Sequence, residues 1–385
     1  NSCPSGQKSM PLLDESQEQG GYRQYIAHTF ATALRQKRPK LKGCLAVLYD
    51  KNPMEASGYA AAMADHFQEV VYYVPYFEHD PEPPARFIDG LLEIKTPQGE
   101  WIPVRAAFRY VTQKPWNRIP IHTKTLILNP TLACLAGGRN KMMAAKAYDF
   151  FNAELEGTGL EIITPETIWD VRKNQVELWL AKMGGQAVIK VPYANAGQGV
   201  FTIVRPSELA AFMSQEFTYD LFIVQSLIGN YKWSSRTSKG TLYHVGTMPN
   251  NKRETFVADI RMMIHSTPTG ILPLSVYARM ARTPLSDQLK EGTDSWDMLG
   301  TNLSIDNKDG SFSSDASRLL MMDRKDFNRL GISVDDLIEA YIQTVLSVIA
   351  IDKMAAKLIS NKGKFRQRLF RSLNPDDALI NEIVI

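Results

Sequence analysis

The chain has 385 residues, of which 44% are hydrophobic and 22% are charged. This length leaves room for two or three domains, and the composition excludes a disordered or fibrous chain. The 44 basic and 41 acidic residues give a net charge of +3, which by itself does not indicate nucleic-acid binding.

The three cysteines, Cys3, Cys44 and Cys134, form no CxxC motif and no cluster with histidines at metal-ligand spacing. Neither a disulfide framework nor a zinc site is therefore expected, and a reducing compartment is the default. The polar N-terminus has no apolar signal-peptide core, and the longest apolar run, residues 337–351, is interrupted by polar residues and is too short to span a bilayer. We therefore expect a soluble protein of the cytoplasm that does not contact a membrane.

The N-terminal part of the chain predicts a helix followed by a small parallel sheet. Apolar residues with helical spacing occupy residues 22–37, so we expect a docking helix there. A buried strand over 43–49, an alanine-rich helix over 55–66 and a second strand over 69–74 follow. This β-α-β order is typical of parallel strands that are joined by a crossover helix.

A hairpin and a second unit come next. Residues 88–94 and 101–110 predict two strands around a Pro- and Gly-containing turn, and 125–128 predicts another short strand. A Gly-Gly turn leads into a helix over 142–154, and 165–183 has the pattern of a further helical stretch.

The remaining elements are long strands, two helices and one irregular stretch. We expect helices over 207–214 and 333–360, strands over 220–225, 255–265 and 271–281, and a polar, aromatic-containing stretch of low periodicity over 229–252. The irregular stretch is interpreted either as a lid or part of an acceptor pocket, or as a surface loop.

The most informative segment is the hairpin over 186–204. Two β-branched runs flank a small loop in which Gly197 and Gly199 leave backbone N–H groups open to an anion. Lys190 lies in the first run, and a buried lysine needs an anionic partner because leaving it unpaired costs several kcal/mol. A phosphate is the natural candidate, whereas an ordinary hairpin whose lysine reaches water is the alternative.

A second set of charges lies on the long strands. Asp259 and Arg261 alternate with apolar residues and so point to the same face of a sheet, where they meet either a ligand or each other. Arg279 and Arg282 end the following strand. Guanidinium groups at this place suit a phosphoryl group or a carboxylate.

In this order the elements resemble the ATP-grasp superfamily. The residues that carry the resemblance are Asn140 and Lys141 with Lys146 at the start of a helix, Lys190 on a strand, the loop 194–199, the strand 222–229, and then Asp259, Arg261, Arg279 and Asn302. The nearest branch is that of the carboxylate–amine ligases, which includes ribosomal-protein glutamate ligases and antibiotic peptide ligases. The resemblance covers about residues 41–330.

The fold implied by the resemblance is α/β and α+β, with a Rossmann-like pre-ATP-grasp domain, a two-lobed ATP-grasp fold and a C-terminal helical segment. The implied division is an N-terminal segment with the docking helix over 1–40, the pre-ATP-grasp α/β domain over 41–135, the N-lobe over 136–205, the C-lobe over 206–330, and a helical, basic segment over 331–385.

The activity implied is ATP-dependent formation of an amide or peptide bond. The carboxylate attacks the γ-phosphate of ATP, and an amine then displaces phosphate from the acyl phosphate, leaving an amide, ADP and phosphate. Amino acids or short peptides would be the substrates, and Arg261 and Arg279 the catalytic residues. The residues implied to bind ATP are Lys141, Lys190, Asn195, Ala196, Gly197, Gln198, Gly199, Gln225, Ser226 and Leu227.

The metal site departs from the family pattern. Members of the family bind Mg²⁺ with an acidic residue two positions before an asparagine, and no Glu-x-Asn occurs at the corresponding place. Asp297 and Asn302 are predicted to bind Mg²⁺ instead, because carboxylate and amide oxygens suit a hard cation. Asn302 could alternatively contact phosphate, and a second candidate set is Asp323, Asp326 and Asn328.

Two other functions stay open. A nucleotide-binding or interaction protein of the same fold that does not catalyse is compatible with the missing Glu-x-Asn. The basic C-terminal segment is interpreted as a solvated helix face or a homodimer contact, in preference to a nucleic-acid surface. A P-loop NTPase and a Rossmann dehydrogenase are disfavoured because neither GxxxxGK[ST] nor a strand-coupled GxGxxG occurs.

Overall fold

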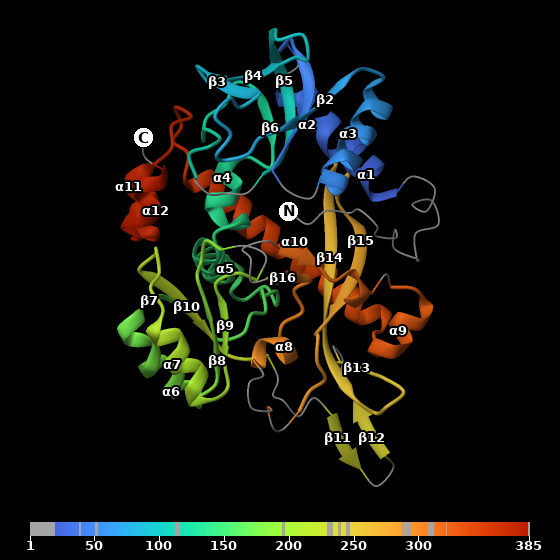
Figure 1. Cartoon of the computed structure of the whole chain (residues 1–385), viewed down its shortest axis with the longest axis vertical. Helices are drawn as coiled ribbons and strands as arrows, with labels where there is room; N and C mark the ends of the chain where they lie inside the picture. Colours follow the sequence, from blue (N-terminus) through green and yellow to red (C-terminus); the bar gives the residue numbers. More distant parts are fainter. Residues whose placement is uncertain are drawn as a thin grey trace.

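The computed structural model describes most of the chain. The described residues are 20–37, 40–50, 53–111, 116–194, 197–228, 234–237, 240–243, 247–286, 289, 294–306, 312–320 and 322–383. The fold is mixed α/β and α+β, as predicted, with a largely parallel sheet near the N-terminus, two antiparallel sheets after it, and helices at the C-terminus (Figure 1). Within the described residues, no helix is long and apolar enough to cross a membrane.

The predicted docking helix is present. It consists of α1 (Gly20–Gln24), a π-helical segment (Tyr25–Phe30) and α2 (Ala31–Lys37). Ile26, Phe30 and Leu34 are buried against the first sheet. On its other side, the hydroxyl of Thr29 donates to the carbonyl oxygen of Ser266 at 3.0 Å. The helix therefore connects the first sheet to the far end of the long hairpin near residue 266.

The first sheet has the strand order β2-β1-β5-β4-β3, with β6 paired to β5. Strands β1, β2, β5 and β6 are parallel, whereas β4 pairs antiparallel with β5 and with β3. Its elements are β1 (Cys44–Tyr49), α3 (Pro53–Phe67), β2 (Val71–Pro75), β3 (Ala85–Ile88), β4 (Leu91–Lys95), β5 (Trp101–Tyr110) and β6 (Leu126–Leu128). The side chains of β1 alternate between two apolar clusters, as the period of a strand requires: Leu45 packs toward α3, and Ala46 packs on the opposite face.

The second sheet is antiparallel, with the order β7-β10-β8-β9. Its elements and the helices around it are α4 (Thr131–Ala133), α5 (Lys141–Leu155), β7 (Thr167–Arg172), α6 (Val176–Lys182), β8 (Ala187–Lys190), β9 (Val200–Ile203), α7 (Pro206–Ser214) and β10 (Leu221–Gln225). The prediction of one helical stretch over 165–183 is wrong in its first half. Residues 167–172 are rich in β-branched and aromatic side chains and pair with β10, so tertiary pairing replaces the helix there.

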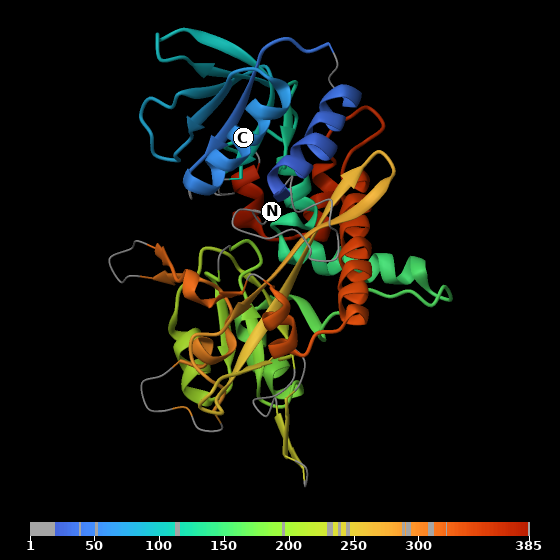
Figure 2. The ribbon, with the colours of Figure 1, turned by 90° about the vertical axis from the view of Figure 1, so that its right-hand side faces the viewer.

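The third sheet has the order β13-β14-β15-β18, and its long hairpin confirms the two predicted strands. Its strands are β13 (Thr247–Pro249), β14 (Thr255–Thr267), β15 (Gly270–Met280) and β18 (Leu319–Leu320). Two further hairpins pair β11 (Ser234–Thr237) with β12 (Gly240–Tyr243) and β16 (Ser304–Asp306) with β17 (Phe312–Ser314). Figure 2 shows the long hairpin running from the lower part of the molecule up to the N-terminal helix. Part of the stretch 229–252 lies outside the described residues, and its described part contains the strands β11, β12 and β13, so the expectation of an irregular stretch is wrong there because these residues pair with neighbouring strands.

The C-terminal part is helical, as predicted. The segment 331–385 contains α10 (Val334–Lys357), α11 (Gln367–Leu373) and α12 (Asp377–Ile383), and the shorter helices α8 (Ser295–Leu299) and α9 (Arg324–Leu330) precede it. Ser333 begins α10 with a capping box, in which its hydroxyl accepts from the amide of Asp336 at 3.2 Å. In the basic segment, Lys353 and Lys357 form ion pairs with Glu154 of α5.

One large apolar core is formed by the second sheet together with helix α5 and the helices α10, α11 and α12. It includes Met143 of α5, Ile189 of β8, Ala350 of α10 and Phe370 of α11. Helices α10, α11 and α12 are thus packed into the same core as the strand that carries Lys190. The domain boundaries given above stay predictions.

Candidate functional site

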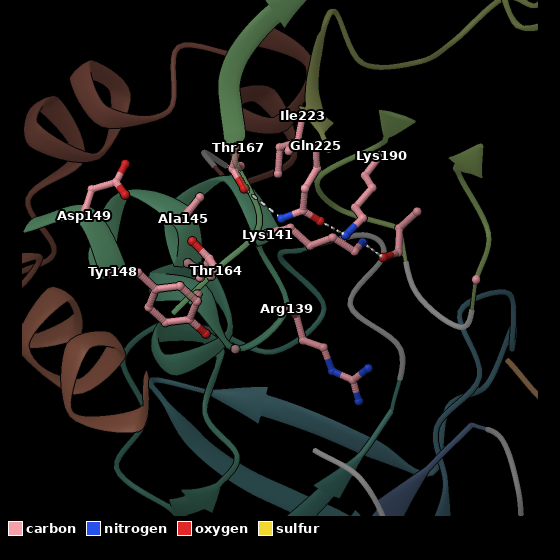
Figure 3. A pocket seen from close by; sticks show the side chains of 15 residues that line it. Arg139, Lys141, Ala145, Tyr148, Asp149, Thr164, Thr167, Lys190, Ile223 and Gln225 are labelled. Atoms are coloured by element: carbon pink, nitrogen blue, oxygen red, sulfur yellow. Dashed lines mark hydrogen bonds between the residues drawn. The ribbon is translucent and has the colours of Figure 1, made fainter. Parts of the chain in front are cut away.

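A cavity of about 440 Å³ lies beside the second sheet (Figure 3). Its lining residues are Gly137, Gly138, Arg139, Lys141, Ala144, Ala145, Tyr148, Asp149, Thr164, Thr167, Lys190, Ala194, Gly197, Ile223 and Gln225. They come from the turn before α5, from α5 itself, from the segment between α5 and β7, and from β7, β8, β10 and the β8–β9 loop. The size falls within the range of pockets that hold small molecules and cofactors.

Lys141 enters the cavity from the first position of α5, which Asn140 caps. Its ammonium group donates to the carbonyl oxygens of Val191, at 3.3 Å, and of Ala194. Burial, together with the nearby cations Lys190 and Arg139, lowers the pKa of Lys141 to about 8. Several positive charges therefore lie close together in this cavity, and each makes it less favourable for Lys141 to stay protonated.

Lys190 lines the cavity from the end of β8. Its ammonium group donates to the side-chain oxygen of Gln225, whose side-chain nitrogen donates to the hydroxyl of Thr167 at 2.7 Å (Figure 3). Burial lowers the pKa of Lys190. Among the described residues, neither Lys141 nor Lys190 forms an ion pair with a carboxylate.

The loop between β8 and β9 closes one side of the cavity. The amide of Val191 donates to the carbonyl oxygen of Gly199 at 2.7 Å, which turns the chain back on itself. Gly197 and Gly199 have φ values of +82° and +63°, a backbone region that favours glycine. Gln198 is exposed, and the predicted ligands Asn195 and Ala196 lie outside the described residues.

Three predicted hinge residues follow one another at the end of β10. Gln225 lines the cavity, but Ser226 and Leu227 are not among its lining residues. The amide of Ser226 donates to the carbonyl oxygen of Glu166 at 2.9 Å, so this backbone donor already has a partner. Only Gln225 of the three therefore reaches the cavity in this structure.

A cluster of charged and aromatic side chains lies on the β14–β15 hairpin. Asp259 is opposite Arg279 in the strand register, and Arg261 is opposite Tyr277. Arg261 forms an ion pair with Asp259 at 2.8 Å, which is the intrastrand alternative, and Thr301 also donates to Asp259 at 2.9 Å. The structure thus brings the two predicted arginines to one face.

Arg279 has capacity left for a ligand. One of its terminal nitrogens contacts the hydroxyl of Tyr277 at 3.3 Å, while its buried Nε has no hydrogen-bond partner among the described residues. Burial lowers the pKa of Arg279, and the neighbouring guanidinium of Arg261 lowers it further. A bound anion would remove both penalties.

Residues 301 and 302 connect the arginine cluster to the cavity. Thr301 holds Asp259, and the next side chain, Asn302, lies against Gly197 of the cavity loop, where a Cβ atom would come within 2.5 Å of its Nδ2. Asn302 is therefore beside the cavity loop, as the phosphate-contacting alternative for this residue requires.

Asp297, the other predicted metal ligand, is engaged elsewhere. Its carboxylate pairs with Arg282 at 2.9 Å, and its carbonyl oxygen accepts from the amide of Thr283 at 3.0 Å. In the alternative set, Asp323 caps α9 by accepting from the amide of Asp326 at 2.9 Å. In the part of the chain that the structure describes, no group of three or more His, Cys, Asp or Glu residues could hold a metal ion.

Several residues of the site were not predicted. Arg139, Thr167, Tyr148 and Asp149 line the cavity, and Tyr277 lies between the two arginines. Arg139 has a signal in the sequence because it directly precedes Asn140 and Lys141. Lys146, in contrast, is buried against Asp170 at 2.5 Å and is not among the lining residues.

No protein-family model matches the sequence, and no curated protein matches it significantly. Several solved structures are similar to it. A RimK domain ATP-grasp protein from Sphaerobacter thermophilus is 14% identical, with a TM-score of 0.36 over 60% of this chain and 89% of that chain. The ATP-grasp ligase PsnB, complexed with a minimal precursor, is 10% identical, with a TM-score of 0.34 over 80% and 99%. D-alanyl-alanine synthetase A from Vibrio cholerae is 10% identical, with a TM-score of 0.42 over 79% and 98%. What this chain binds therefore has to be argued from its own residues.

Proposed function

We propose that the chain is an ATP-dependent carboxylate–amine ligase of the ATP-grasp superfamily that forms an amide or peptide bond through an acyl phosphate. The observation that carries the proposal is the convergence of Lys141 and Lys190 on one cavity without a carboxylate partner among the described residues. Two partly buried cations that line one cavity are unfavourable unless an anion binds between them.

A nucleoside triphosphate suits this cavity. Lys141 and Lys190 would contact its phosphate oxygens, and the loop that contains Gly197 would approach the phosphates with its backbone. Their charges act more strongly there than in bulk water, because both groups are partly buried. Gln225, which joins Lys190 to Thr167, would orient this lysine.

The arginine cluster supports transfer chemistry in addition to binding. Arg261 and Arg279 would stabilise the charge that develops on the transferred phosphoryl group, or hold the substrate carboxylate through two hydrogen bonds. The unpartnered Nε of Arg279 supplies a donor that no described residue uses. Amino acids or short peptides are the substrate class that we propose, because each of them supplies both a carboxylate and an amine.

Magnesium would neutralise phosphate charge in such a reaction. The pair formed by Asp297 and Asn302 does not fit it well in this structure, because Arg282 holds the carboxylate of Asp297. The assignment of these two residues to the metal stays a prediction.

A second function, nucleotide binding without catalysis, is favoured by this same ion pair. Both functions predict ATP binding, and only the ligase predicts turnover.

The experiment is a phosphate-release screen with ATP, Mg²⁺ and amino acids or dipeptides, supplied singly and in pairs. A ligase releases phosphate only when a suitable carboxylate and amine are present, and the Lys190→Ala variant should lose this release. Lys362→Ala, which changes an exposed lysine, serves as the matched control. ATP binding without stimulated release by any substrate pair would favour the second function, and absence of ATP binding would refute both.

A further inference from the structure

A chain of buried amides connects the C-terminal segment to the candidate nucleotide site. The side-chain nitrogen of Asn140 donates to the side-chain oxygen of Asn374 at 2.6 Å, and the side-chain nitrogen of Asn374 donates to the hydroxyl of Tyr193. Asn140 and Asn374 are fully buried, and Tyr193 is 1% exposed. Buried polar groups of this kind stabilise one arrangement, because each broken bond leaves a desolvated group without a partner.

The two ends of this chain of hydrogen bonds, Asn140 and Tyr193, lie in the two segments that position Lys141. Asn140 caps α5 by accepting from the amide of Met143 at 3.2 Å, and Lys141 is the next residue. Tyr193 lies in the β8–β9 loop between Val191 and Ala194, whose carbonyl oxygens accept from the Lys141 ammonium group.

Asn374 lies between these two supports although it comes from a distant part of the sequence, directly after α11. The backbone adds one more bond across the same junction, from the amide of Lys141 to the carbonyl oxygen of Pro192 at 3.0 Å. The start of α5 and the loop are therefore held together twice, once directly through Lys141 and once through Asn374.

We propose that Asn374 is a positioning residue that fixes the β8–β9 loop relative to Lys141, so that the C-terminal segment is required for the nucleotide site. The part that concerns nucleotide rests on the proposed function. The part that concerns the loop rests only on the contacts described above.

The chain offers a matched pair of substitutions. Tyr193 and Tyr219 are both buried, their rings lie 4.7 Å apart, and both hydroxyls bind the C-terminal segment. Tyr193 binds Asn374, whereas Tyr219 donates to Glu382 at 2.7 Å, which is not part of the amide chain. Tyr193→Phe and Tyr219→Phe therefore each remove one hydrogen bond to this segment, and only the first removes one from the loop.

The measurement is hydrogen exchange of three amides in the full-length protein, those of Lys141, Val191 and Val200, which all bond across the loop or its junction with α5. Loss of one buried hydrogen bond should accelerate their exchange roughly five-fold or more in Tyr193→Phe. Tyr219→Phe should leave these amides unchanged after correction for global stability. Asn374→Ala should behave like Tyr193→Phe.

ATP affinity provides the second readout. Tyr193→Phe and Asn374→Ala should raise the Kd for ATP about five-fold or more, and Tyr219→Phe should not. The proposal would be overturned if Tyr193→Phe and Tyr219→Phe accelerated the exchange of the three amides equally, or if neither did. It would also be overturned if the ATP affinity of Tyr193→Phe were unchanged although its loop exchanged faster. If the wild-type protein binds no ATP, the proposed function fails, while the exchange comparison still decides whether Asn374 positions the loop.

Discussion

The side chain of Asn302 lies directly against Gly197, so that a Cβ atom at position 197 would come within 2.5 Å of the Asn302 amide nitrogen. The two residues are far apart in the sequence: Gly197 lies in the β8–β9 loop, and Asn302 lies in the segment after α8. Because Gly197 lines the cavity and Thr301 binds Asp259, this contact places the two halves of the proposed site next to each other.

We expect Gly197→Ala to weaken ATP binding more than an alanine substitution at a glycine with a similar left-handed φ elsewhere. At position 197 the substitution adds backbone strain at φ +82° and a close contact with Asn302, and it should weaken ATP binding about ten-fold or more. Gly157→Ala is the matched control, since Gly157 has φ +80° and nothing within 4 Å of an added Cβ. The ATP Kd and the urea midpoint of both variants separate strain from contact; equal effects in the two variants would contradict the importance of the Asn302 contact.

Lys190→Ala should bind ATP at least about ten-fold more weakly than the wild type. The substitution removes one charge-assisted contact to phosphate, which contributes about 1.5–3 kcal/mol. Calorimetric titration with ATP measures the effect, and the exposed Lys362→Ala variant should bind like the wild type. An ATP affinity that is unchanged in a folded Lys190→Ala protein would exclude the proposed phosphate site.

Lys141 should make both ATP binding and stability depend on pH above neutrality. Its folded-state pKa of about 8 lies below the ordinary lysine value of 10.5, so the unfolded state binds more protons between these two values. The contribution of Lys141 to stability is therefore least favourable below about pH 8 and improves as the pH rises from about 8 toward 10.5.

ATP affinity should change in the opposite direction. Phosphate needs the protonated lysine and is itself fully ionised in this range, its second pKa being about 6. The Kd should therefore rise as the pH increases through about 8, up to roughly ten-fold per pH unit. Titrations at several pH values test this, and Lys141→Gln should flatten both profiles. A wild-type Kd that does not change between neutral pH and pH 9.5 would show that this lysine does not bind phosphate.

Removal of either arginine of the cluster should affect turnover far more than ATP binding. If Arg261 and Arg279 contact the phosphoryl group as charge develops, Arg261→Ala and Arg279→Ala should lower kcat about a hundred-fold or more. Arg279→Lys should restore only part of the rate, because an ammonium group lacks the planar fork that binds two oxygens. ADP formation with saturating substrates and ATP binding by calorimetry are the measurements.

The exposed Arg324→Ala variant is the control for these arginines. Arg261→Ala also leaves Asp259 without its ion-pair partner, so its unfolding midpoint should be compared with that of Arg279→Ala. Normal turnover in both folded variants would place the reacting group elsewhere.

The sequence by itself determined most of the elements, because hydrophobic periodicity and capping residues act locally. The docking helix, the crossover helix α3, the long hairpin and the capped helix α10 all lie where the pattern predicts them. It also singled out Lys190, since a lysine in an apolar strand is a local conflict that a ligand can resolve.

Only the tertiary structure decided the contacts between residues that are far apart in the sequence. Strand β7 forms because β10 offers it a pairing partner, although Ile168 and Val171 have the three-residue spacing of a helix face. Asp297 is held by Arg282, a pairing that no spacing rule predicts. Asn374 reaches Asn140 and Tyr193 across 234 and 181 residues of sequence because α10, α11 and α12 pack into the core of the second sheet. Contacts of this kind depend on how whole elements pack, so they appear only once the chain has folded.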